Sequence, residues 1–137
     1  MPADYVIDSA HRLVISRGHG VFIAADYQEH MIRLLRDPAF DPDFDQLVDC
    51  RSIVKMDLSG QQIMALASRS VFSTKSRRAF VVVSDVQFGL SRMLAAHRET
   101  MEGQSVMVFR QMSEALAWLG RPADLIPDRA TEPPPAA

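Results

Sequence analysis

The sequence contains few of the features that define secreted or membrane proteins. It has one cysteine, Cys50, so no disulfide can form within the chain. Its strongly apolar stretches, such as 79–83, are far shorter than the roughly 20 residues that a membrane-spanning helix needs. The first residues lack the basic end and the apolar run of a signal peptide. We therefore expect a cytoplasmic protein without a transmembrane segment.

The sequence also lacks an excess of charge of one sign. Its 15 lysine and arginine residues stand against 17 aspartate and glutamate residues, which gives a net charge of -2 at pH 7. Proteins that bind nucleic acid usually carry a clear basic excess, so nucleic acid is not an expected partner. The hydrophobic share of 47% and the charged share of 23% are ordinary for a globular protein. A chain of 137 residues is long enough for one domain with its own core.

Proline is scarce along most of the chain and concentrated at its end. Five of the eight prolines lie within 121–137, at positions 122, 127, 133, 134 and 135. Because proline lacks a backbone donor and fixes its own φ, this spacing is incompatible with a continuous helix or an inner strand. We therefore predict a folded domain over 1–120 and a Pro-rich, flexible tail over 121–137. Leu125 and Ile126 are candidates for packing back onto the domain.

Within 1–120, short β-branched runs alternate with segments of helical periodicity. This alternation predicts an α/β domain in which helices connect the strands of a mixed sheet. The expected strands are 5–7, 13–16, 46–50, 79–83 and 106–109. The expected helices lie around 27–35, 60–72, 90–101 and 113–119. The first two strands form a hairpin, and the order is β-β-α-β-α-β-α-β-α, with about five strands and four helices.

Local signals refine two of these helices. In the first, an apolar stripe is expected to consist of Tyr27, Met31, Leu34 and Leu35, and Asp37-Pro38 ends the helix. In the last, Ser113 is the expected N-cap.

The most specific stretch is 48–60, with the sequence VDCRSIVKMDLSG. It resembles the central signature of the STAS domain, the family of bacterial anti-sigma-factor antagonists and sulfate-transporter tails. In that signature an aspartate at a strand end leads, through apolar loop positions, to Asp-Ser-Ser-Gly at a helix start. The matching residues are Asp49 at the strand end, Ile53 in the loop, and Asp57, Ser59 and Gly60 in the motif. Leu58 departs from the usual serine.

The remainder of the chain is similar to one branch of this family. The Asp-Pro-Phe loop at 37–44 and the closing segment 117–119 look more like the SpoIIAA-like branch of uncharacterised bacterial proteins than like the antagonists. The resemblance implies a single SpoIIAA-like domain. It also implies a non-enzymatic protein-interaction module, regulatory in the manner of an anti-sigma-factor antagonist.

In the antagonists a partner kinase phosphorylates the serine at the Ser59 position, and the added charge releases the partner. The resemblance therefore implies that Ser59 is a candidate phospho-switch, that Asp49, Asp57 and Gly60 belong to the partner loop, and that the partner is a kinase-like or sigma-related regulator. A phosphate at a helix N-terminus would meet backbone N–H groups that lack partners. However, Ser59 and Gln62 also fit a capping box, which explains the serine by backbone hydrogen bonding alone. Both interpretations stay open.

Two further surfaces are candidates for docking. Arg69, Lys75, Arg77 and Arg78 form a basic group that is either a solvated rim or a docking site for an acidic partner or a lipid head group. Three phenylalanines are candidates for exposed apolar contacts in a homodimer: Phe22, Phe72 and Phe88.

No pattern points to a metal, a cofactor or a catalytic centre. The acidic stretch at positions 37, 41, 43 and 45 fails the spacing of a calcium loop, and the four histidines form no zinc pattern. Cys50 is interpreted as a small buried residue and His97 as a residue at the edge of the core. The sequence holds no nucleophile elbow, phosphate loop or dinucleotide fingerprint. We therefore expect no enzymatic activity.

A second function from a different class also fits the sequence. Eight methionines are many for this length, and flexible thioethers line adaptable cavities as well as irregular cores. Relatives of the SpoIIAA-like branch are often likened to lipid-exchange domains. The alternative prediction is therefore a carrier of a small apolar ligand or lipid, held between the helices and the sheet.

Overall fold

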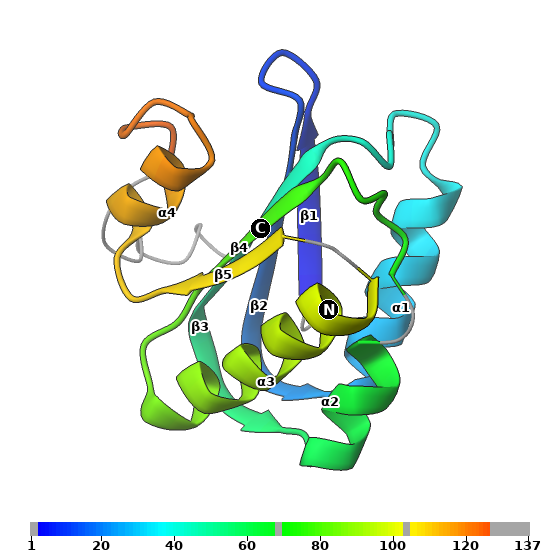
Figure 1. The fold of residues 1–137 in the computed structure, drawn as a ribbon, viewed down its shortest axis with the longest axis vertical. Helices are drawn as coiled ribbons and strands as arrows, with labels where there is room; N and C mark the ends of the chain where they lie inside the picture. Colours follow the sequence, from blue (N-terminus) through cyan, green and yellow to red (C-terminus); the bar gives the residue numbers. More distant parts are fainter. Residues whose placement is uncertain (1–2, 68–69, 103–104, 127–137) are drawn as a thin grey trace.

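The computed structural model describes residues 3–67, 70–102 and 105–126, and its elements follow the predicted order (Figure 1). The strands are β1 (Ala3–Asp8), β2 (Leu13–Ile23), β3 (Asp45–Asp57), β4 (Arg77–Val81) and β5 (Ser105–Phe109). The helices are α1 (Ala24–Arg36), α2 (Gly60–Ala67), α3 (Asp85–Glu102) and α4 (Met112–Trp118). The prediction of an α/β domain with five strands and four helices is confirmed.

The five strands form one mixed sheet in the order β1-β2-β3-β4-β5. β1 and β2 are antiparallel, and the Asp8 side chain stabilises their turn by accepting a hydrogen bond from the backbone N–H of His11 at 3.0 Å. From β2 to β5 every neighbouring pair is parallel, so α1, α2 and α3 are crossover helices. No helix within the described residues has the length and hydrophobicity needed to cross a bilayer.

β2 and β3 are much longer than predicted. Their second halves pair with each other from His19–Ser52 to Ile23–Asp57, beyond the points where β1 and β4 stop pairing. Two register shifts interrupt this pairing, and Gly20 adopts a positive φ of 67° between them. The paired second halves of β2 and β3 curl beneath α2 and α3 (Figure 1). The sequence does not predict the second half of β3, because the polar residues Arg51 and Ser52 interrupt its apolar run. Pairing with the distant strand β2 makes this segment extended.

Alternating strand residues place two different cores on the two faces of the sheet. On one face, α4 packs against the sheet with side chains that are completely buried: Leu13, Leu47, Ala79, Val81, Met112, Ala115, Leu116 and Leu119. On the other face, α1, α2 and α3 pack against residues such as Phe22, Val48 and Phe80. In Figure 1, α4 lies apart from the other three helices.

Three helix predictions need correction. On α1 the buried stripe is Tyr27, His30, Met31 and Leu34, whereas Leu35 is 58% exposed, because the stripe follows i, i+3, i+4 and i+7. Residues 70–72 are not helical, so the second helix does not reach Phe72. Gln111 is the N-cap of α4, and Ser113 lies inside that helix and is not the cap.

The first residue of the predicted tail, Arg121, is hydrogen-bonded to the domain. The Arg121 guanidinium donates to the Asp45 carboxylate at 2.9 Å and to the backbone oxygens of His11 and Arg12. Leu125 and Ile126 pack against the α4 core, as predicted. Residues 127–137 lie outside the described part of the chain.

Candidate functional site

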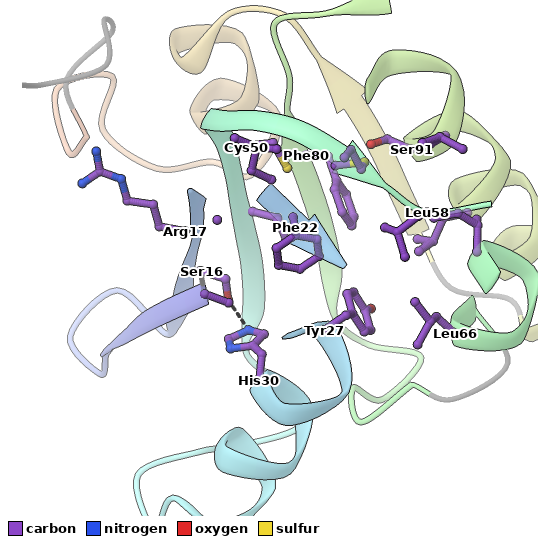
Figure 2. Close-up of a pocket in the computed structure, with 18 of the residues that line it drawn as sticks. Ser16, Arg17, Phe22, Tyr27, His30, Cys50, Leu58, Leu66, Phe80 and Ser91 are labelled. Atoms are coloured by element: carbon purple, nitrogen blue, oxygen red, sulfur yellow. Dashed lines mark hydrogen bonds between the residues drawn. The ribbon is translucent and has the colours of Figure 1, made fainter. Parts of the chain in front are cut away.

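A cavity of about 50 Å³ lies between the sheet and the three crossover helices (Figure 2). Its lining is mainly apolar. The apolar lining residues include Phe22 and Met56 near the ends of β2 and β3, Leu58, Ile63 and Leu66 at α2, and Phe80 and Leu94 on β4 and α3. A water-sized group needs roughly 10–15 Å³ on this measure, so the cavity accommodates about four such groups. A whole lipid does not fit without displacement of the wall.

Small residues and one close backbone approach keep this space open. A Cβ at Gly18 would lie only 2.7 Å from Cδ1 of Ile53, so glycine lets β2 approach this side chain. Cys50 and Ser91 also line the cavity, from β3 and α3. Larger side chains at these two positions would extend into the space.

A chain of buried polar side chains forms one end of the cavity. Arg78 Nε donates to Gln46 Oε1 at 3.0 Å, and Gln46 Nε2 donates to Ser16 Oγ at 2.9 Å. Ser16 Oγ lies 2.9 Å from Nε2 of His30 (Figure 2). Because an arginine can only donate, it fixes the orientation of the Gln46 amide. The arrangement that leaves fewest groups unsatisfied then has the Ser16 hydroxyl donating to His30, with the imidazole hydrogen on Nδ1.

Tyr27 extends this polar chain toward α2. Its hydroxyl oxygen accepts hydrogen bonds from Arg78 Nη2 at 3.4 Å and from Arg98 Nη2 at 3.3 Å. Arg98, which is completely buried, also donates to the backbone oxygen of Leu66 at 3.3 Å. The tyrosine ring stands between β2 and α2 in Figure 2.

His30 is neutral at physiological pH. Burial lowers the pKa of His30 from 6.5 to about 4, and the positive charges of Arg33 and Arg78 act in the same direction. The carboxylate of Asp4 opposes this effect.

The Ser16–His30 pair has the atoms of a nucleophile and a base but not their arrangement. A catalytic histidine is normally oriented by a third group on its other nitrogen, and among the residues that the structure describes Nδ1 of His30 has no hydrogen-bond partner. Its depressed pKa also makes it a weak base. Cys50 is equally unsuited to attack, because burial and the neighbouring Asp49 raise the pKa of its thiol to about 12.

The motif residues are divided between two places. Asp49 lies within β3 and not at a strand end, and its carboxylate accepts hydrogen bonds from the buried Arg51 at 2.9 and 3.0 Å. Ile53 is likewise a strand residue and not a loop residue. Asp57, Ser59 and Gly60 stay together at the junction of β3 and α2. The structure therefore does not bring Asp49 to the predicted partner loop, because β3 continues for eight residues beyond it.

Ser59 forms the predicted capping box. Its Oγ accepts a hydrogen bond from the backbone N–H of Gln62 at 3.1 Å, and its own N–H donates to Gln62 Oε1 at 2.9 Å. The side chain remains exposed. The loop is also a wall of the cavity, because Met56 and Leu58 line it on either side of Asp57.

The predicted basic rim is not a continuous surface. Arg78 is buried in the cavity wall, with its guanidinium 5.0 Å from the ring of Phe72. Arg77 donates to the backbone oxygens of Trp118 and Leu119, at the end of α4. Lys75 is exposed, and Arg69 lies outside the described residues. Burial of Arg78 follows from its alternation with Arg77 on β4, which places it on the inner face of the sheet.

The phenylalanines predicted as exposed contacts of a homodimer are not on an open surface. Phe22 and Phe72 are buried and Phe88 is partly buried, so the first two do not supply exposed dimer contacts.

In the described ranges, no three histidine, cysteine, aspartate or glutamate side chains are grouped as metal ligands. The Asp37 and Asp41 carboxylates accept hydrogen bonds from the backbone N–H groups of Ala39 and Asp43, within their own loop.

The sequence interpretation did not single out the polar end of the cavity: Ser16, Tyr27 as a hydroxyl, His30, Gln46 and Arg98. Two signals were available. His30 falls three residues after Tyr27 on the apolar stripe, and Gln46 opens a strand whose next residues are apolar. Polar residues at such positions are expected to have buried partners.

Comparison with known proteins identifies the fold. A solved structure of an uncharacterised DUF3478-family protein with a SpoIIAA-like fold, from Shewanella loihica PV-4, is similar to this chain with a TM-score of 0.56. The likeness covers 85% of this chain and 93% of the other, at 17% sequence identity. No protein-family model matches the sequence, and no curated protein matches it. The chain therefore has a SpoIIAA-like fold, as its motif and element order predicted.

Proposed function

We propose that this SpoIIAA-like domain is a non-enzymatic module that binds a small, mainly apolar ligand in the cavity beneath α1, α2 and α3. The observation that supports it is a contrast between the two faces: eight side chains on the α4 face are completely buried, whereas this face retains an apolar space of about 50 Å³. Protein interiors are normally close-packed, so a retained space next to buried polar groups favours binding. The ligand has a few heavy atoms and is smaller than a membrane lipid.

Xenon is a suitable probe, because it enters small apolar cavities. Met31 and Met56 are part of the cavity wall, whereas Met107 on β5 is not. In methyl NMR spectra, we expect xenon to shift the Met31 and Met56 signals and to leave Met107 unchanged.

A filled cavity provides the matched control. Ser91→Val adds carbon atoms at the wall, whereas Ser105→Val makes the same change on β5, away from the cavity. We expect the first variant to lose the xenon response and the second to keep it. No response in the wild type, or an equal response in Ser91→Val, would contradict the proposal.

A second candidate function is the docking of a regulatory protein at the loop of Asp57, Ser59 and Gly60. Three exposed apolar side chains surround this loop and favour it: Ile23 pairs with Asp57, Met64 follows Gly60 by one helical turn, and Met93 approaches Gly60 from α3. Phosphorylation of Ser59 would add charge within this apolar surround and weaken docking. The partner expected from the STAS resemblance is a kinase-like or sigma-related regulator.

The test of this candidate compares the wild type with Ser59→Asp and Ser59→Ala as baits in a lysate of the native host. The expected result is a kinase-like or sigma-related protein that the wild type and Ser59→Ala retain and Ser59→Asp releases. Ser105→Asp is the charge control. Identical binding by all four baits would remove the switch from the proposal.

A further inference from the structure

Two hydrogen-bond donors on one side of α1 line the cavity without an acceptor. Tyr27 and His30 lie three residues apart, are 8% and 5% exposed, and both belong to the cavity wall. The hydroxyl oxygen of Tyr27 accepts from two arginines, and in the described part of the chain no acceptor takes its own hydrogen. Over the same described ranges Nδ1 of His30 has no partner either, and the hydrogen-bond chain from Arg78 places a hydrogen on it.

The charge near His30 comes from two arginines, Arg33 and Arg78, and from the carboxylate of Asp4, so positive charge is in excess. Arg78 lines the cavity, and its guanidinium stays protonated at any physiological pH. The walls formed by residues such as Leu58, Ile63 and Leu94 are apolar, and Ser91 on α3 adds one hydroxyl group to the lining. The donors and the positive charge are therefore concentrated at one end of the cavity, and the lining elsewhere is mainly apolar.

We propose that the occupant of this cavity is a short-chain monocarboxylate, with its carboxylate at the Tyr27–His30–Arg78 end and its carbon chain toward α2 and α3. This inference rests on the proposed function of the cavity as a ligand site. An ionised carboxylate has acceptors only, so it matches donors that lack acceptors, and the arginine compensates its charge. A carboxylate with one or two further carbons has about four or five heavy atoms, which corresponds to the size of the cavity.

The probes are sodium propanoate and n-propylammonium chloride, which have equal carbon counts and opposite head-group charges. Each is titrated into the full chain while the methyl signals of Met31, Met56 and Met107 are recorded. We expect propanoate to shift Met31 and Met56 with saturation, n-propylammonium to leave them unchanged at the same concentrations, and Met107 to respond to neither.

Tyr27→Phe removes one donor and keeps the ring. We expect it to weaken propanoate binding about tenfold, because a hydrogen bond to a charged group is lost. Tyr5→Phe is the matched control, since the Tyr5 hydroxyl donates to Asp37 at 2.8 Å and lies outside the cavity wall. That variant is expected to bind propanoate like the wild type.

Xenon binding without a propanoate response would overturn the carboxylate and leave the cavity function in place. Absence of both responses would overturn both. Equal responses to propanoate and n-propylammonium would also overturn the proposal of a carboxylate ligand. Equal propanoate affinity in Tyr27→Phe and the wild type would overturn it as well. If Tyr27→Phe does not fold, the two wild-type titrations decide between these outcomes.

Discussion

The two faces of the sheet are built on different principles. Under α4, eight apolar side chains are completely buried in the contact of the helix with the sheet. Under α1, α2 and α3, the core contains a cavity, two buried arginines and a chain of hydrogen bonds that ends on donors without acceptors. Close packing maximises stability, whereas a cavity and unsatisfied donors both reduce it. The comparison indicates that the first face contributes more to the stability of the fold, and that the second face holds the space that the proposed ligand would occupy.

The largest effect is expected on the packed face. Leu116→Ala removes a fully buried side chain from the contact of α4 with the sheet, and should lower the free energy of unfolding by about 2–5 kcal/mol. Urea denaturation followed by circular dichroism measures this change. The matched control Leu35→Ala, at an exposed position on α1, should stay within about 0.5 kcal/mol of the wild type. Similar losses in both variants would contradict the assignment of stability to the packed face.

The second effect is a pH dependence that belongs to the cavity face. The pKa of His30 is about 4 in the folded protein and 6.5 in the unfolded chain, so the unfolded chain binds the proton more readily. The contribution of neutral His30 to the free energy of unfolding is therefore complete above pH 6.5. It is lost as the pH falls toward 4, by about 1.4 kcal/mol per pH unit.

Urea denaturation at several pH values between 7.5 and 4 should show a shallower decline for His30→Gln than for the wild type. Asp8 and Asp37 do not obscure this window, because their pKa values are lowered from 3.8. Parallel profiles for the two proteins would show that His30 does not titrate as its burial predicts.

The third effect compares added volume on the two faces. Ala115→Val inserts carbon atoms into the filled contact of α4 with the sheet, and should destabilise the protein by about 1–3 kcal/mol. Ser91→Val directs similar volume into the cavity, so its thermal unfolding midpoint should remain closer to that of the wild type. If Ser91→Val is the more destabilising variant, the two faces do not differ in packing as the structure indicates.

The smallest effect concerns the cap of α2. Ser59→Ala removes the hydrogen bond to Gln62 and should cost about 1 kcal/mol, whereas Ser59→Asp keeps an acceptor and should cost less. Ser105→Ala is the control on an exposed strand position. Thermal unfolding of the three variants measures these differences. A neutral Ser59→Ala would leave the capping box without an energetic role and strengthen the alternative role of Ser59 in docking.

The predictions from sequence succeeded where the signal is local. The hairpin, the end of α1 before Pro38 and the capping box at Ser59 depend on residues within a few positions of one another. They failed where contacts with a distant segment determine the length of a strand or the burial of a side chain. β3 continues past Asp49 because β2 pairs with it, and Arg78 is buried because the sheet turns its side chain toward α1.

By itself, the sequence determined the order of the elements and the serine cap, because periodicity, turn residues and capping act over short distances. Its resemblance to the SpoIIAA-like branch implied the architecture. Only the tertiary structure decided that Ser16, Tyr27, His30, Gln46 and Arg78 meet at one end of an apolar cavity. These residues come from four different elements, and nothing in their local sequence specifies their neighbours. The packing of the crossover helices against the sheet brings them together, and burial then requires that they find hydrogen-bond partners in one another.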